Sequence, residues 1–114
     1  MPLEMAVEKL DPNSAVLTIT GALTLGTNLK ILDDNVQRLI SGGVTRMVLD
    51  LSACFYSDSA GLGFLIHTYG KVNEQGGSTR MCGVGERIME LLKMTKTENI
   101  IPIDADRQES IAKL

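Results

Sequence analysis

One stretch of the chain joins a short apolar run to a segment with helical spacing, and it reads Asp50-Leu51-Ser52-Ala53-Cys54-Phe55-Tyr56-Ser57-Asp58-Ser59-Ala60-Gly61-Leu62-Gly63. The run that leads into it, residues 47–51, is apolar enough for a buried central strand. Beyond it, apolar side chains recur at the period of a helix up to Gly76-Gly77, which end that helix: Leu62, Leu65, Ile66, Tyr69 and Val72. The stretch therefore lies where a central strand passes into a helix.

The rest of the chain alternates between strand and helix patterns around this junction. Residues 3–8 and 16–19 have strand patterns separated by the turn residues 11–13, which predicts an antiparallel hairpin. A helix is expected over residues 29–40, then a strand at 80–82, a helix at 88–92, a strand at 100–103 and a short terminal helix at 111–114. Pro102 in the last strand favours a position at the sheet edge. This order predicts an α/β fold, a mixed and mainly parallel sheet of about five strands with about four helices.

Length and composition favour a single small domain over residues 1–114. The chain has 114 residues, 44% of them hydrophobic but only 4% aromatic, so we expect one aliphatic core. No apolar run is long enough to insert into a membrane, and the N-terminus carries no secretory signal pattern. The two cysteines form neither a CxxC pair nor a zinc motif, which favours a cytoplasmic location. A net charge of −3 argues against binding to nucleic acid.

Ser57, Asp58 and Ser59 stand where the second helix begins. The first N–H groups of a helix lack partners within it, so a phosphate on Ser59 would meet those donors and the positive end of the helix dipole. It would also add about −1.5 to −2 charges beside Asp58, enough to repel a partner that accepts the neutral hydroxyl. The same residues are equally good N-caps. Gly61 and Gly63, costly near a helix start, indicate close approach of a strand or of a partner's backbone, or packing alone.

The residue patterns of hydrolases, nucleotide-binding proteins and metal sites are incomplete in this sequence. We therefore expect no catalytic residues, no metal site and no cofactor. A hydrolase elbow needs a leading glycine before Ser59 that the chain lacks, and His67 lies about two turns along the same helix. The glycines at 83 and 85 do not complete a dinucleotide fingerprint, and no Walker lysine is present. The carboxylate pairs at 33–34 and 104/106 have the pattern of surface or capping charges.

Together, Asp50-Leu51-Ser52 and the run from Asp58 to Gly63 resemble the signature of STAS domains, specifically of anti-sigma factor antagonists. The likeness extends over nearly the whole chain. It implies a non-enzymatic protein that binds an anti-sigma factor serine kinase when dephosphorylated. That kinase would phosphorylate Ser59, and a PP2C-like serine phosphatase would restore it.

The resemblance also implies a binding surface, made of Thr24 and the residues of the motif: Asp58, Ser59, Ala60, Gly61, Leu62 and Gly63. Thr24 stands where the family often has an acidic residue, and Ser57 is a second possible phosphate acceptor. Because STAS domains also occur in stress-signalling and lipid-transport complexes, a non-switching scaffold or adaptor subunit is the alternative function.

Overall fold

A computed structural model describes residues 2–114 and contains one five-stranded mixed sheet. Strands β1 (Glu4–Asp11) and β2 (Ser14–Leu23) form an antiparallel hairpin. Strands β3 (Arg46–Ser57), β4 (Ser78–Cys82) and β5 (Ile103–Asp104) follow in parallel, so the strands are arranged in chain order across the sheet. The predicted α/β fold with a mainly parallel sheet is confirmed.

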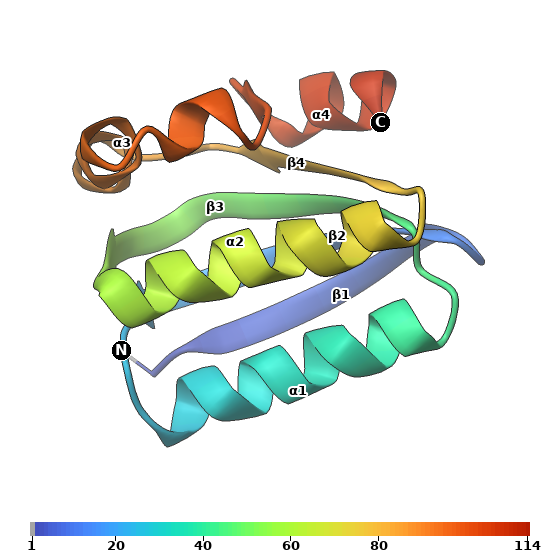
Figure 1. Cartoon of the computed structure of the whole chain (residues 1–114), viewed down its shortest axis with the longest axis horizontal. Helices are drawn as coiled ribbons and strands as arrows, with labels where there is room; N and C mark the ends of the chain where they lie inside the picture. Colours follow the sequence, from blue (N-terminus) through green and yellow to red (C-terminus); the bar gives the residue numbers. More distant parts are fainter. Residues whose placement is uncertain (1) are drawn as a thin grey trace.

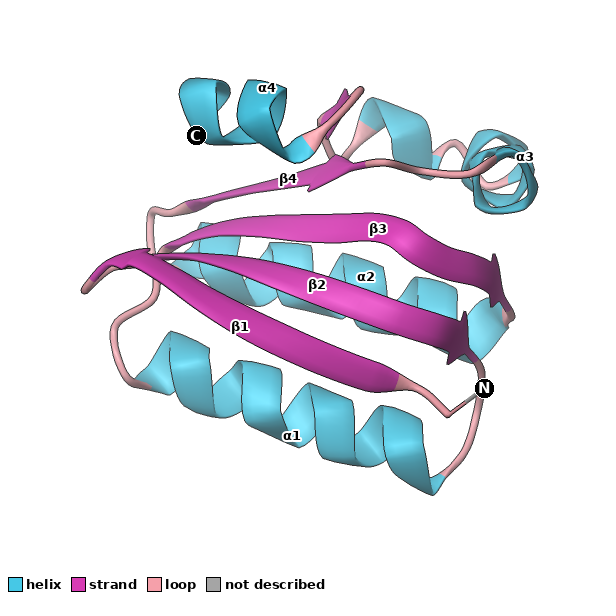
Figure 2. Cartoon of the chain, turned by 180° about the vertical axis from the view of Figure 1, so that it is seen from behind, coloured by secondary structure: helices cyan, strands magenta, loops and turns pink. Residues whose placement is uncertain are grey.

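The helices cover the two faces of the sheet unequally. Helices α1 (Thr27–Ser41) and α2 (Ser59–Glu74) lie side by side on one face, as Figures 1 and 2 show from opposite sides. Helix α3 (Glu86–Met94) and the short 3-10 helix η1 (Thr97–Asn99) come next, and α4 (Arg107–Lys113) ends the chain. Within the described residues no helix combines the length and the apolar character that crossing a bilayer requires.

Strand alternation divides the core into a large and a small part. Odd-numbered residues of β2, and of β3 up to residue 51, point toward α1 and α2 and form much of the main cluster, with Leu17, Ile19, Leu49 and Leu51 fully buried. The opposite face carries a small cluster of Val16, Val48 and Cys82, against which the side chains of α4 and the last residue pack. Both clusters are mainly aliphatic, as the scarcity of aromatic residues predicted, and Phe64 is the buried aromatic side chain of the main cluster.

Two strands differ from the sequence prediction. Strand β3 continues through Ser57, six residues beyond the apolar run, because two register shifts against β2 interrupt its alternation and disguise it as a loop. The last strand was predicted at residues 100–103 but consists only of Ile103–Asp104. Ile101, which precedes this strand, is buried in the core. Pro102 does lie at the sheet edge, where its carbonyl accepts a 2.8 Å hydrogen bond from the Met81 N–H.

Candidate partner-binding site

The start of α2 is capped by Asp58. Its backbone is extended, and its Oδ1 accepts a 2.9 Å hydrogen bond from the Gly61 N–H. The Asp58 carbonyl accepts the first helical bond, from the Leu62 N–H at 3.0 Å. Asp58 is therefore the N-cap that its residue type favours, and Ser59 is the first helical residue with its side chain exposed.

The same carboxylate ties the helix to the connection between β2 and α1. Its Oδ2 accepts a 2.9 Å hydrogen bond from the Leu25 N–H, and the Asp58 N–H donates to the Leu23 carbonyl at 3.1 Å. The N–H groups of Leu25 and then Gly61 hold the pKa of Asp58 below its ordinary value. Asp58 is thus ionised at neutral pH, and it fixes two segments far apart in the sequence.

This geometry changes how a phosphate on Ser59 would be received. We expected it to meet free N–H donors, but the Gly61 N–H is already bonded to Asp58. The added charge of about −2 would lie beside a carboxylate that is itself negative. A phosphate on Ser59 would therefore meet both the favourable helix dipole and the charge of the Asp58 carboxylate that already occupies the Gly61 N–H.

The two candidate acceptors differ in access. Ser57 is 7% exposed and its Oγ donates to the Asp58 carbonyl at 3.0 Å, whereas Ser59 is exposed. A kinase can reach the Ser59 hydroxyl without moving the backbone, and it cannot reach that of Ser57 in the same way.

The structural requirement for glycine differs between the two glycines of the motif. A Cβ at Gly61 would collide with the Leu23 carbonyl and the Ser57 hydroxyl, and would come within 2.7 Å of the Leu23 Cβ. The close approach inferred from Gly61 is therefore made by β2 of the same chain. At Gly63 nothing lies within 4 Å of the Cβ position, so the fold itself does not require a glycine there.

The predicted site residues gather at one end of the molecule but do not all reach its surface. Ser59 and Gly63 are exposed, and Asp58 and Ala60 are half-buried. Gly61 and Leu62 are buried, and the Leu62 side chain belongs to the core. Half-buried Thr24 is covalently next to Leu25, so the Asp58 bond holds it near the motif.

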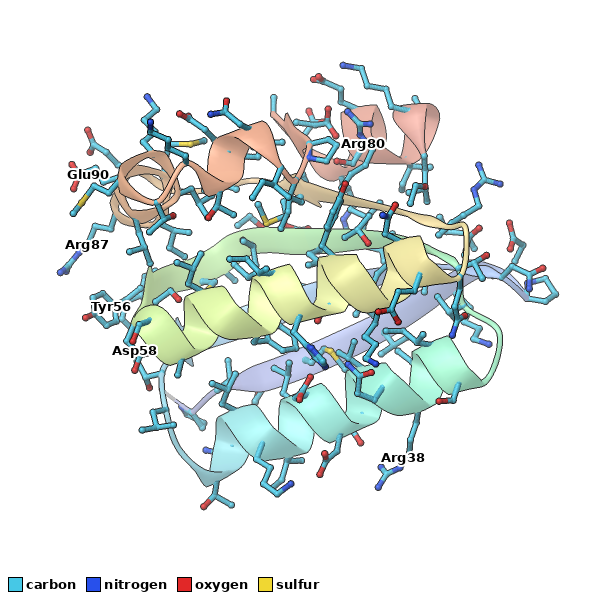
Figure 3. All side chains as sticks on the ribbon, viewed as in Figure 1. Arg38, Tyr56, Asp58, Arg80, Arg87 and Glu90 are labelled. Atoms are coloured by element: carbon cyan, nitrogen blue, oxygen red, sulfur yellow. The ribbon has the colours of Figure 1, made fainter. Side chains whose placement is uncertain are left out.

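Two hollows lie on either side of the motif, and sequence reasoning found neither. One, of about 310 Å³, runs between α1 and α2 and is lined mainly by Leu25, Leu29, Lys30, Ala60, Gly63 and Phe64. The other, of about 220 Å³, is lined by Tyr56, Ser57, Arg87, Glu90, Leu91 and Met94. The Arg87 guanidinium stacks 5.1 Å from the centre of the Tyr56 ring. Figure 3 shows Glu90, Arg87, Tyr56 and Asp58 at the same end of the molecule.

The single histidine and the carboxylates of the 104/106 pair lie in separate parts of the described fold. His67 is exposed on α2, at the edge of the groove between the helices, as its spacing predicted. No three His, Cys, Asp or Glu side chains in residues 2–114 are placed to share a metal ion. Asp106 caps α4 as expected, with its Oδ1 2.9 Å from the Glu109 nitrogen. Asp104, in contrast, is buried and paired with Arg80 rather than a surface charge.

The family model for the STAS domain matches residues 4–110. The chain belongs to the STAS domain family. An anti-sigma-B factor antagonist of Bacillus subtilis is 35% identical over 66 residues, 54% of this chain and 61% of the relative. An anti-sigma F factor antagonist of Paenibacillus polymyxa is 29% identical over 83 residues, 73% of this chain and 68% of the relative. The first match thus spans about three-fifths of that relative's length.

Solved structures of anti-sigma factor antagonists share the fold at low identity. An anti-sigma factor antagonist from Mycobacterium paratuberculosis has a TM-score of 0.83 and 20% identity, covering 97% of this chain and 92% of the other. The unphosphorylated anti-sigma factor antagonist SpoIIAA has a TM-score of 0.75 and 18% identity, covering 96% of each chain. These likenesses establish the fold of this STAS domain.

Proposed function

We propose that this STAS domain is an anti-sigma factor antagonist, switched by phosphorylation of Ser59. The observation that carries the proposal is the exposed Ser59 hydroxyl, held at the first position of α2 beside ionised Asp58. The relatives named anti-sigma factor antagonists support the same function. SpoIIAA, whose fold this chain shares, has been solved in unphosphorylated and phosphorylated forms.

The proposed switch needs no catalytic group in this chain. The partner, an anti-sigma factor with serine kinase activity, transfers the γ-phosphoryl of ATP to the Ser59 Oγ, and the hydroxyl proton leaves to the kinase. A PP2C-like phosphatase hydrolyses the phosphate with water. In the unmodified state the partner covers the neutral hydroxyl, and in the modified state it faces two adjacent anions that binding would have to desolvate. Because these partners act on transcription, the proposed location is the cytoplasm.

Intact-mass analysis tests the proposal most directly. The protein is incubated with ATP and each purified anti-sigma factor kinase of the source organism, and the modified residue is mapped. We expect one phosphate, on Ser59, with one of these kinases. Ser59→Ala should bind that kinase and resist modification, Ser59→Asp should lose binding at least about tenfold, and Ser57→Ala should be modified like wild type. A phosphate on another residue, or equal binding by Ser59→Asp, would refute the switch.

The same preparation distinguishes the scaffold alternative. A non-switching adaptor should remain unmodified with every kinase and should form a large homo-assembly in light scattering without a partner.

A further inference from the structure

We propose that Leu25 is a partner-contacting residue held in place by the Asp58 carboxylate, and that a phosphate on Ser59 releases it. This inference rests on the proposed function, because it names how the Ser59 switch reaches a second part of the binding surface. It extends that surface from the start of α2 into the connection between β2 and α1.

Leu25 is exposed to an unusual degree for an aliphatic residue. The residue is 81% exposed, although Leu23, two positions earlier, is fully buried in the core. Leu25 lines the groove of about 310 Å³ between α1 and α2, together with Ala60 and Gly63. Ala60 follows Ser59 directly, so an apolar side chain that shares a groove with Ala60 is placed for contact with the protein that must reach Ser59.

The backbone N–H of Leu25 is bonded to one side chain, that of Asp58. Helix α1 begins at an N-cap glycine, Gly26, with no side-chain cap and no acidic residue in its first turn. Among the described residues, the Asp58 carboxylate is the side-chain group that hydrogen-bonds to the backbone of residues 24–26, through the Leu25 N–H at 2.9 Å. Backbone bonds hold the residues on either side, from the Thr24 N–H to the Ala22 carbonyl and from the Lys30 N–H to the Gly26 carbonyl, but the exposed Leu25 side chain adds no packing to hold Leu25 itself.

A phosphate on Ser59 competes with Asp58 for the same donors. The Asp58 Oδ1 accepts from the Gly61 N–H in the first turn of α2, which is where a phosphate on the first helical residue would also bind. Two anions cannot share those donors without repulsion, and the phosphate carries the larger charge. The Asp58 carboxylate is then displaced, and its bond to the Leu25 N–H is broken.

The occupant of the groove is the anti-sigma factor kinase of the proposed function. Its contact with Ser59 must extend onto the adjoining residues, and the groove starts at Ala60 on one side and Leu25 on the other. Because no atom lies within 4 Å of the Cβ position of Gly63, an apolar side chain of that kinase has room to enter beside Leu25. We therefore expect the partner to contact the Ser59 hydroxyl and the Leu25 side chain at the same time.

A measurement without partner tests the release. Hydrogen exchange of the Leu25 amide is compared in wild type, Ser59→Glu and Asp58→Asn; asparagine still caps the helix but offers one acceptor oxygen in place of two. We expect the Leu25 amide to exchange at least about tenfold faster in both variants, and the Leu62 amide to be unchanged. Equal exchange of Leu25 in all three proteins would overturn the proposed link.

A binding measurement tests the contact. With the kinase that modifies Ser59 as the probe, Leu25→Ala should weaken binding at least about tenfold without changing Tm, because the removed atoms are exposed. Ile100→Ala is the matched control, since Ile100 is 48% exposed but lies before the edge strand β5. Equal binding by Leu25→Ala and wild type refutes the contact. If no kinase modifies Ser59 the proposed function fails, and the exchange measurement still decides whether Asp58 holds Leu25.

Discussion

Replacing Gly61 by alanine should destabilise the domain, because a Cβ there meets atoms that cannot move freely. The obstacles are the Leu23 carbonyl, which belongs to the backbone of a buried strand, and the buried Ser57 hydroxyl. Overpacking of this kind costs about 1–3 kcal/mol, and a backbone obstacle places the cost toward the upper end. Alanine recovers about 1 kcal/mol of helix propensity. The net loss is about 1–2 kcal/mol in the free energy of unfolding.

Gly63 supplies the matched control, two residues further along the same helix. Its Cβ position is open, so Gly63→Ala should gain about 0.5–1 kcal/mol from helix propensity alone. Urea denaturation should therefore separate the two variants by about 1.5–3 kcal/mol, with wild type between them. If Gly61→Ala is as stable as wild type, the close approach of α2 to β2 is not the reason for glycine at this position.

Three further expectations concern the face of the sheet under α4. Arg80 first, then Ser110, holds the pKa of buried Asp104 at about 2, below its ordinary 3.8, so its stabilisation is complete above pH 4 and lost as pH falls through 2. As the pH is lowered through that window, we expect the free energy of unfolding to fall by about 2 kcal/mol in acid denaturation. The Arg80→Met variant should lose this stabilisation at a higher pH, because Asp104 no longer has Arg80 as its partner. Arg107→Ala strips Asp50 of a partner at 3.0 Å and should lower the free energy of unfolding by about 2 kcal/mol in urea. Desolvation raises the pKa of the Cys82 thiol to about 11, so iodoacetamide at pH 8 should label it only after unfolding; rapid labelling of the native protein would contradict its burial.

Local chemistry could be predicted from the sequence, and long-range pairing could not. The helix cap at Asp58 was predictable because capping depends on residues within one turn. The second bond of the same carboxylate, to Leu25, joins residues 33 apart, and the Arg107–Asp50 pair joins residues 57 apart. Neither has a periodic pattern. The continuation of β3 to Ser57 was missed because its register shifts break the alternation that identifies a strand.

The aspartates of the fold differ in how their charges are balanced, and this difference bears on the proposed switch at Ser59. Asp50 and Asp104 are each paired with an arginine, so their charges are neutralised where they lie. Among residues 2–114, Asp58 forms no ion pair, and its charge is held by N–H groups alone. A phosphate added next to one of these paired carboxylates could also form an ion pair with the nearby arginine. Next to Asp58 there is no such cation, so the proposed phosphate on Ser59 would compete with the carboxylate for the Gly61 N–H, and its repulsion would act at the surface that the proposed partner covers.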